Sequence, residues 1–223
     1  GIDFIELEQA PEAKGAPSNS ISITDAPYSA VPNDGQDDSK AFLDALKDAD
    51  KENKTLYIPE GTFDFDQKLV LSATDMRITG AGIWHTRLHF TSEEQAGGGI
   101  EFLDSSSNVE MDNLYMDSEL KSRFHQEANY KGIAGVLGEN SKLHDLWLEH
   151  FECGIWVGDY VEADKMKYTD KLIVSNSRIR NNFADGVNFA QGTKNSKVQN
   201  SNIRGNGDDG LATFASKAIV KIK

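Results

Sequence analysis

Two spacings of apolar residues divide the chain. After residue 34, apolar positions recur every three or four residues, which predicts one helix with a single buried face. The residues of that face are Phe42, Ala45, Leu46 and Ala49. The residue that caps its amino end is Asp37, Asp38 or Ser39. Residues 55–63 then predict a strand, a turn and a strand, and beyond residue 64 short runs of Val, Ile and Leu alternate with polar residues, as strands do.

The strand-rich part contains an internal repeat. Residues 174–189 and 198–213 align at an offset of 24, and eight of the sixteen positions are identical. A looser copy covers residues 143–156, and residues 158–170 are predicted to be an inserted loop. A period near 24 without helices is typical of one coil of a right-handed parallel β-helix. An antiparallel sandwich or barrel needs frequent hairpin turns and gives no reason for such identity.

Residues 1–20 end in a stretch of Pro, Ala, Ser and Asn, which indicates a linker or an N-terminal extension. Residues 21–223 are predicted to form an all-β domain, the N-terminal part of a parallel β-helix with about 24 residues per coil and a short capping helix. The single cysteine, Cys153, lies in an apolar stretch and is predicted to be a buried, inert thiol.

Charge narrows the choice of partners. Lys and Arg number 23 and Asp and Glu 36, which gives a net charge of −13. Without a basic stripe the chain is not expected to bind nucleic acid. Its acidity also disfavours anionic polymers and favours a neutral ligand. No apolar run approaches the ~18 residues that span a bilayer, so no membrane partner is expected.

The repeat brings three carboxylates together. Asp185 and Asp209 occupy equivalent positions in successive coils, which lie ~4.8 Å apart. Asp208 precedes Asp209 at a glycine-containing turn, where both side chains can point outward. Close like charges disfavour full ionisation, so one carboxyl can carry a proton beside ionised neighbours. General acid–base hydrolysis uses such a pair, although Asx turns at strand ends are the structural alternative.

Four segments resemble glycoside hydrolase family 87, the α-1,3-glucanases (mutanases) and mycodextranases. They are residues 78–90, 143–156, 179–193 and 206–214. The resemblance covers roughly residues 24–214. Its most specific part is the pair of motifs Asp-Gly at residues 185–186 and Asp-Asp-Gly at residues 208–210. It implies a secreted β-helix enzyme of the pectin-lyase-like superfamily that cleaves α-1,3 bonds in neutral α-glucan of the mutan or nigeran type, with endo action and inversion.

The family's catalytic aspartates match Asp185, Asp208 and Asp209. A further likeness to polygalacturonases makes Asp208 the general acid, with Asp185 and Asp209 activating water. Inversion predicts about 6.5–9.5 Å between acid and base carboxyls. The resemblance also implies more coils than this chain contains, so we expect a truncated β-helix that is an incomplete fragment with weak or no activity on polymer.

Four more residues are predicted to bind substrate: Asn188, Gln191, Trp156 and His150. Trp84 and Trp147 can likewise stack on sugars, and packing between strands is the alternative for all three tryptophans. Arg180 and Arg204, 24 residues apart, can hold the carboxylates in register or lie on the surface. Asn176 and Asn200 predict an internal asparagine ladder.

No cofactor is expected to be required. The five histidines show no metal-binding spacing, and the loop at residues 33–38 lacks the ligand pattern of an EF-hand. A structural calcium ion is compatible with the sequence, but no motif locates it. Two other functions stay open: a calcium-dependent polysaccharide lyase, with Arg180 or Arg204 as base, and a non-catalytic carbohydrate-binding β-helix. The sequence indicates neither the linkage preference between these glucans nor the oligomeric state.

Overall fold

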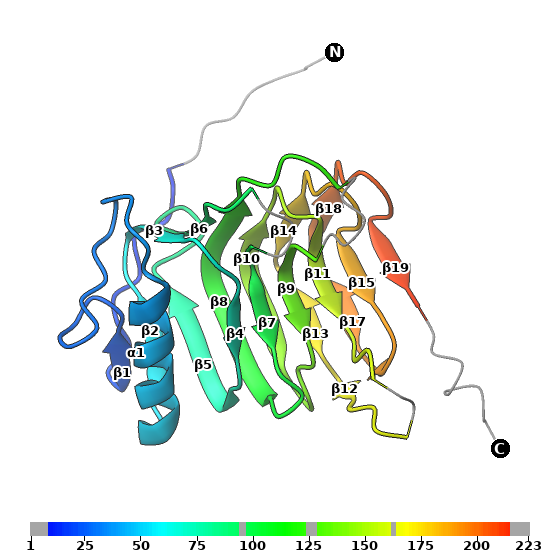
Figure 1. The fold of residues 1–223 in the computed structure, drawn as a ribbon, viewed down its shortest axis with the longest axis horizontal. Coiled ribbons are helices and arrows are strands. Elements are labelled where there is room, and N and C mark those ends of the chain that lie inside the picture. Colours follow the sequence, from blue (N-terminus) through cyan, green and yellow to red (C-terminus); the bar gives the residue numbers. More distant parts are fainter. Residues whose placement is uncertain (1–8, 94–96, 124–128, 162–163, 215–223) are drawn as a thin grey trace, which may run out of the picture.

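The computed structural model describes residues 9–93, 97–123, 129–161 and 164–214. Within these residues the chain winds into coils that stack side by side, with one helix at the first end and the last strands at the other (Figure 1). Every pairing between the described strands is parallel. The predicted parallel β-helix is therefore confirmed, and an antiparallel sandwich is excluded.

The described strands form two long sheets and one short sheet. The first sheet contains β1 (Ser20–Ser22), β2 (Thr55–Ile58), β3 (Gly61–Phe65), β5 (Thr74–Gly80), β6 (Thr86–Phe90), β8 (Ser107–Ser118), β10 (Lys142–Leu148), β13 (Ile173–Ser175), β14 (Arg178–Arg180), β17 (Lys197–Gln199) and β18 (Asn202–Arg204). The second contains β4 (Leu69–Leu71), β7 (Ile100–Phe102), β9 (Lys131–Gly135), β11 (Cys153–Val157), β15 (Val187–Phe189) and β19 (Leu211–Thr213). The short sheet pairs β12 (Thr169–Asp170) with β16 (Thr193–Lys194).

The register between coils follows the sequence repeat. Val174 pairs with Val198 and Ile179 with Ile203, so the last described coil is 24 residues long, as predicted. Ile155 pairs with Val187, which makes the preceding coil 32 residues long at this point. The extra residues lie between β11 and β12, where the insertion was predicted.

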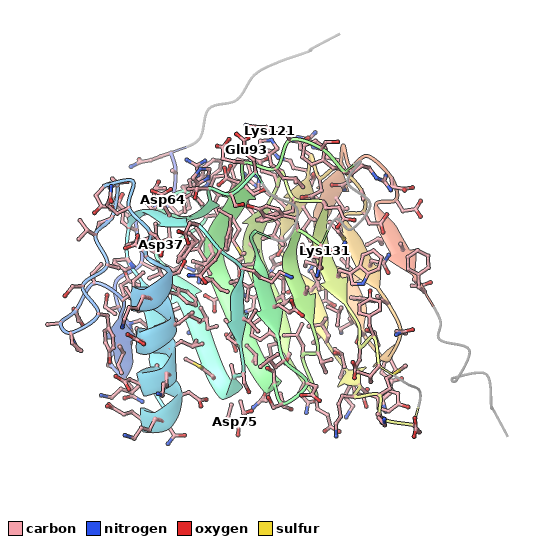
Figure 2. The ribbon with its side chains drawn as sticks, in the orientation of Figure 1. Asp37, Asp64, Asp75, Glu93, Lys121 and Lys131 are labelled. Carbon is pink, nitrogen blue, oxygen red and sulfur yellow. The ribbon has the colours of Figure 1, made fainter. Side chains whose placement is uncertain are left out.

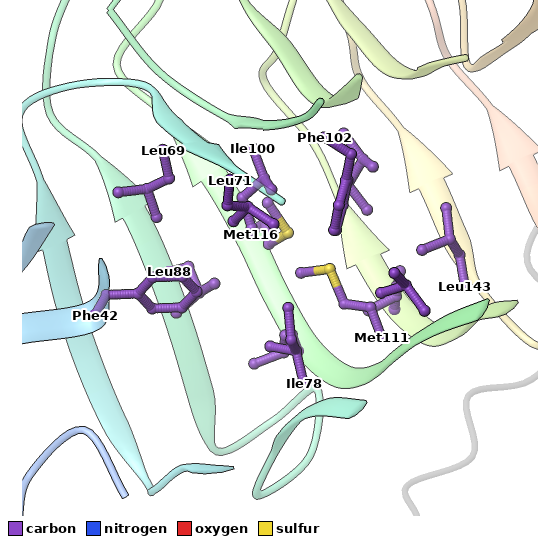
Figure 3. Close-up of a cluster of buried hydrophobic side chains, with 14 of the residues drawn as sticks. Phe42, Leu69, Leu71, Ile78, Leu88, Ile100, Phe102, Met111, Met116 and Leu143 are labelled. Atoms are coloured by element: carbon purple, nitrogen blue, oxygen red, sulfur yellow. The ribbon is translucent and has the colours of Figure 1, made fainter. Parts of the chain in front are cut away.

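The predicted helix is confirmed as α1 (Ser39–Glu52), whose buried face includes Phe42, Ala45, Leu46 and Ala49. It packs on β1, β2 and β4 and covers the open end of the first coil (Figure 1). Phe42 meets Phe65 edge to face at 5.7 Å between ring centroids, which links the helix to the interior. Leu88 and Met116 of the first sheet point toward side chains of the second sheet in the core (Figure 3).

The predicted internal asparagine ladder at Asn176 and Asn200 is wrong. Both residues are exposed and have positive φ, 51° and 49°, so they form left-handed turns, which asparagine tolerates better than most residues. An amide pair lies six residues later instead: the buried Asn182 donates through Nδ2 to Oδ1 of the partly buried Asn206 at 3.0 Å. These two positions were also identical in the repeat, but identity alone does not distinguish a turn from an amide ladder.

Residues 9–19, before β1, have no helix or strand. They are bound to the coils by hydrogen bonds: Lys14 N–H donates to Ala81 O at 2.8 Å, and Tyr57 Oη donates to Lys14 O at 2.7 Å. Among the described residues, no helix is long and apolar enough to cross a membrane.

The tight stacking of coils predicts a strong effect of Gly186→Ala. An added Cβ would lie 2.5 Å from Ile203 Cγ2 and 2.7 Å from the Gly210 carbonyl oxygen, which belongs to the next coil's backbone. We expect the free energy of unfolding to fall by about 1–3 kcal/mol, measured by urea unfolding. Gly15→Ala is the control, because its added Cβ meets no atom within 4 Å. Equal stability of the two variants would contradict the close packing of these coils.

Asp38 predicts a pH-dependent stability. Burial raises the pKa of its carboxyl from 3.8 to about 6, and its Oδ2 has no hydrogen-bond partner among the described residues. The native state therefore holds the proton more tightly than the unfolded state, and stability falls as pH rises from about 4 to about 6. Asn at this position can still accept the Val31 N–H. We expect Asp38→Asn to stabilise the protein by up to about 2 kcal/mol more at pH 8 than at pH 4, measured by denaturant unfolding. A pH-independent difference would contradict this.

Candidate active site

The three aspartates lie where the second sheet begins in the last two described coils. Asp185 precedes β15, and its carbonyl oxygen accepts the Gly154 N–H at 3.1 Å. Asp209 precedes β19 and likewise accepts the Gly186 N–H at 2.9 Å. Asp185 therefore stacks on Asp209, and Asp208 lies beside them. One carboxylate oxygen from each of the three residues lies within 4.8 Å of the other two.

Asp185 is the buried and most firmly held member of this carboxylate cluster. It is 6 % exposed, and both of its oxygens accept hydrogen bonds. Asn188 Nδ2 donates to Oδ2 at 2.7 Å, and the Asp209 N–H donates to Oδ1 at 3.2 Å. Asn188 is itself fully buried, and its Oδ1 has no partner within the described part of the chain. Asn188 is thus positioned to orient Asp185.

Asp208 is the exposed member and pairs with a cation. About half of its side chain is accessible, and its Oδ2 accepts hydrogen bonds from Nη1 and Nη2 of Arg123, both at 3.1 Å. Arg123 follows β8 and is separated from Asp208 by 85 residues. No repeat or motif in the sequence pointed to this arginine. Its charge offsets part of the repulsion among the three carboxylates.

An aromatic cavity lies on the same face of the second sheet. The register places Ala134, Trp156 and Asn188 side by side on neighbouring strands, so Trp156 adjoins the residue that holds Asp185. A cavity of about 470 Å³ lies next to Trp156. Its lining comprises Glu101, Asn129, Lys131, Ala134, Gly135, Trp156, Gly158 and Tyr160.

Trp156 has aromatic and cationic neighbours. Tyr160 lies roughly parallel to it at 6.4 Å between centroids, and Phe214 lies at 5.7 Å. Lys131 lies on the second sheet (Figure 2). Its Nζ is 4.5 Å from the centre of the Trp156 ring, and it also forms an ion pair with Glu152. Sequence analysis identified Trp156 but not these neighbours, because Lys131 and Phe214 come from other coils and Tyr160 from the inserted loop after β11.

Two predicted substrate-binding residues, Gln191 and His150, form their hydrogen bonds with other parts of the coils. Gln191 follows the far end of β15, and its Nε2 donates to the Asp159 carbonyl of the preceding coil. His150 lies in the turn before β11, where its carbonyl oxygen accepts Ser118 Oγ at 2.6 Å. Among the described residues, neither side chain forms a hydrogen bond or ion pair with the three carboxylates.

Three other residues singled out in the sequence are Arg180, Trp147 and Cys153. Arg180 does not hold the carboxylate cluster, because its Nε pairs with Glu149 at 3.3 Å and its guanidinium lies 4.4 Å from the Trp147 ring centre. Trp147 is half-buried and belongs to the first sheet. Cys153 is fully buried, as predicted, and burial raises the pKa of its thiol far above the ordinary range.

In the described part of the chain, two groups of residues have oxygen or nitrogen atoms close enough to hold a cation together. One is the carboxylate cluster of Asp185, Asp208 and Asp209. The other is Glu110, Asp112 and His144, on the first sheet. In the second group Arg77 already donates to both oxygens of Asp112, at 2.7 and 3.0 Å, which leaves little unbalanced charge for a metal ion. In the first group the ion pair between Arg123 and Asp208 offsets the charge of one of the three carboxylates.

Residues 36–219 match the family described as the alpha-1,3-glucanase catalytic domain D2. The chain is similar to the solved catalytic domain of Agl-KA, with 48 % identity and a TM-score of 0.88 over 94 % of this chain and 37 % of that one. It is also similar to the catalytic unit of a thermostable GH87 alpha-1,3-glucanase from Streptomyces thermodiastaticus, with 26 % identity and a TM-score of 0.78 over 94 % of this chain and 35 % of that one. The chain thus spans little more than a third of these domains. No curated protein sequence matches it.

More distant structures show the same fold. A GH87 alpha-1,3-glucanase catalytic domain in complex with nigerose has 23 % identity and a TM-score of 0.67 over 92 % of this chain and 33 % of that one. Variants of such a domain, solved with nigerose or tetrasaccharides, carry alanine in place of aspartate at three positions, separated by 23 residues and by one. The A-module of a mannuronan C-5 epimerase from Azotobacter vinelandii has 17 % identity and a TM-score of 0.67 over 86 % of this chain and 53 % of that one.

Proposed function

The chain belongs to the family of alpha-1,3-glucanase catalytic domains, and we propose that it hydrolyses α-1,3-glucosidic bonds through Asp185, Asp208 and Asp209. The observation that carries this proposal is the convergence of three carboxylates within 4.8 Å beside an aromatic cavity. The separations of 23 residues and one between these aspartates equal those of the aspartates replaced in the related domain.

In this proposal Asp208 is the general acid. Its exposed carboxyl can reach the glycosidic oxygen of a bound glucan, protonate it and so allow the C–O bond to break. Asp185 and Asp209 then share the activation of water. Asp185 accepts hydrogen bonds from Asn188 and from the backbone N–H of Asp209, and these bonds hold both of its carboxylate oxygens in a fixed orientation.

The proposed substrate is a neutral α-glucan of the mutan or nigeran type. The net charge of −13 and the exposed carboxylates disfavour anionic polymers, whereas the indole of Trp156 offers an apolar surface for a sugar ring. The cavity next to Trp156 lies toward the earlier coils, so a polymer can continue past the aspartates along the stack, as endo action requires. Such a polymer is found outside cells, which favours a secreted protein.

Inversion is the proposed stereochemical course, for which acid and base carboxyls are expected about 6.5–9.5 Å apart. One oxygen from each of the three carboxylates lies within 4.8 Å of the other two. In this proposal Asp185 and Asp209 hold one water molecule between their oxygens, and Asp208 protonates the glycosidic oxygen.

The catalytic assignment predicts large losses for Asp185→Asn, Asp208→Asn and Asp209→Asn. Each is expected to lower the rate of reducing-end release from insoluble α-1,3-glucan or nigeran by about 10²–10⁴-fold, because each removes a proton donor or acceptor. Asp104→Asn, at an exposed position, is the matched control and should keep wild-type activity. Dextran is the control substrate. Retained activity in all three variants would sink the mechanism, and an ultraviolet-absorbing product would indicate a lyase.

Inversion predicts that the first product carries a β-anomeric reducing end, since the bond broken is α. Proton NMR of α-1,3-linked oligosaccharide hydrolysis, recorded before mutarotation, should show the β signal growing first. Initial formation of the α-anomer would indicate retention and would assign a nucleophilic role to one aspartate of the compact carboxylate cluster.

A further inference from the structure

The outer face of the first sheet carries a second group of aromatic residues, on a different sheet from the aspartates. Arg87, Tyr115, Trp147 and Arg178 stand in register on successive strands. Their neighbours along each strand, including Leu88, Met116 and Ile179, are fully buried, so these four side chains point outward. The rings of Tyr115 and Trp147 are 4.9 Å apart.

Trp84 lies over this row and is half-exposed. It comes from the turn between β5 and β6, and 50 % of it is accessible. Its ring meets Trp147 edge to face, with centroids 5.2 Å apart and an interplanar angle of 84°. The guanidinium of Arg178 lies 4.8 Å from the centre of the Trp84 ring. These contacts fix the indole in place while half of it stays open to a ligand.

Trp84 borders two hollows of about 360 and 270 Å³, both of which it lines together with Ile83 and His85. Side chains of the first hollow include Asn33, Glu60 and Arg87. Side chains of the second include Lys14, Asn113 and Asp145. A fixed indole bordered by donors and acceptors on both sides suits a sugar: the ring stacks on the aromatic face, and its hydroxyl groups meet the rim.

The charges of this face suit an uncharged ligand. Although the chain carries −13 overall, three carboxylates of this sheet are paired with arginines. Asp112 pairs with Arg77 at 2.7 Å, Asp117 with Arg87 and Glu149 with Arg180 at 3.3 Å. Paired charges leave a weak net field, which neither attracts an anion nor repels a neutral polymer.

We infer that Trp84 is the centre of a second glucan-binding surface, formed by the first sheet and separate from the aspartates. It takes the same class of ligand, a neutral α-glucan chain, and so rests on the proposed function for the identity of that ligand. It holds insoluble polymer on one face of the coils while the second sheet carries out hydrolysis, which raises the local concentration of substrate chains.

The test compares binding to insoluble polymer with turnover of a short soluble substrate. Wild type, Trp84→Ala, Trp84→Phe and Tyr168→Ala are each prepared with and without Asp208→Asn. Tyr168 is the control, an aromatic residue with similar exposure (45 %) on the loop before β12. Depletion isotherms on α-1,3-glucan use the Asp208→Asn forms, so that the polymer persists. Kinetics on α-1,3-linked tetrasaccharide use the forms with Asp208 intact.

We expect Trp84→Ala to bind insoluble glucan about tenfold more weakly, Trp84→Phe to be intermediate and Tyr168→Ala to match wild type. Turnover of the tetrasaccharide should stay within about twofold for all three. Unchanged polymer binding by Trp84→Ala would overturn the inference. So would a change in oligomeric state, measured by sedimentation, because it would show that Trp84 is a contact between copies of the chain. If Trp84→Ala melts at a lower temperature, the Trp84→Phe isotherm decides.

The two proposals fail differently. Failure of the proposed function means that no tetrasaccharide is cleaved, whatever residue stands at position 84. Failure of the second surface means that cleavage persists and depends on the aspartates, while Trp84→Ala binds insoluble glucan as wild type does. Binding that depends on Trp84 without any cleavage would keep the surface and reject the enzyme.

Discussion

Each coil of this protein must place its side chains directly over those of the coil before, and the rest of the structure depends on that register. Parallel strands ~4.8 Å apart leave equivalent positions in permanent contact. Inside, the contact is favourable: Val174 lies against Val198, and Ile179 against Ile203. Outside, the same geometry stacks charges, so the identity of each outward residue is constrained by its neighbours in two coils.

Between β5 and β10 the first sheet meets this constraint by alternating opposite charges, whereas further on Arg180 stacks on Arg204. Arg77 pairs in register with Glu110, which pairs in turn with Lys142, and His89 pairs with Asp117. The stack of Asp185 on Asp209 departs from that rule, and it does so where Asp208 adds a third carboxylate. Two residues lessen the electrostatic repulsion among these carboxylates without removing it. Asn188 donates a hydrogen bond but carries no charge, and Arg123 forms an ion pair that is exposed to solvent. An unfavourable stack beside a cavity is the arrangement that catalysis would use.

The parts that could be predicted from the sequence are those in which the register repeats a local pattern. Helix α1 and its buried face follow from the spacing of Phe42 and its partners, and the stacking of the aspartates follows from the 24-residue identity. Contacts between unlike segments left no such trace. Arg123 reaches Asp208 across 85 residues, and Tyr160 reaches Trp156 from an inserted loop. Gln191, close to Asp185 in sequence, lies at the other end of β15, because one extended strand separates them.

Register also determines how two binding faces on one β-helix can cooperate. The sheets that carry Trp84 and the aspartates belong to the same coils, so neither face can move toward the other to deliver a bound chain. A short oligosaccharide held at Trp84 therefore gains nothing at the aspartates. A polymer particle presents many chains at once, and anchoring one of them raises the concentration of the others around the second sheet. Binding at the first sheet therefore speeds hydrolysis only of insoluble or very long substrates, for which diffusion of the substrate itself is slowest.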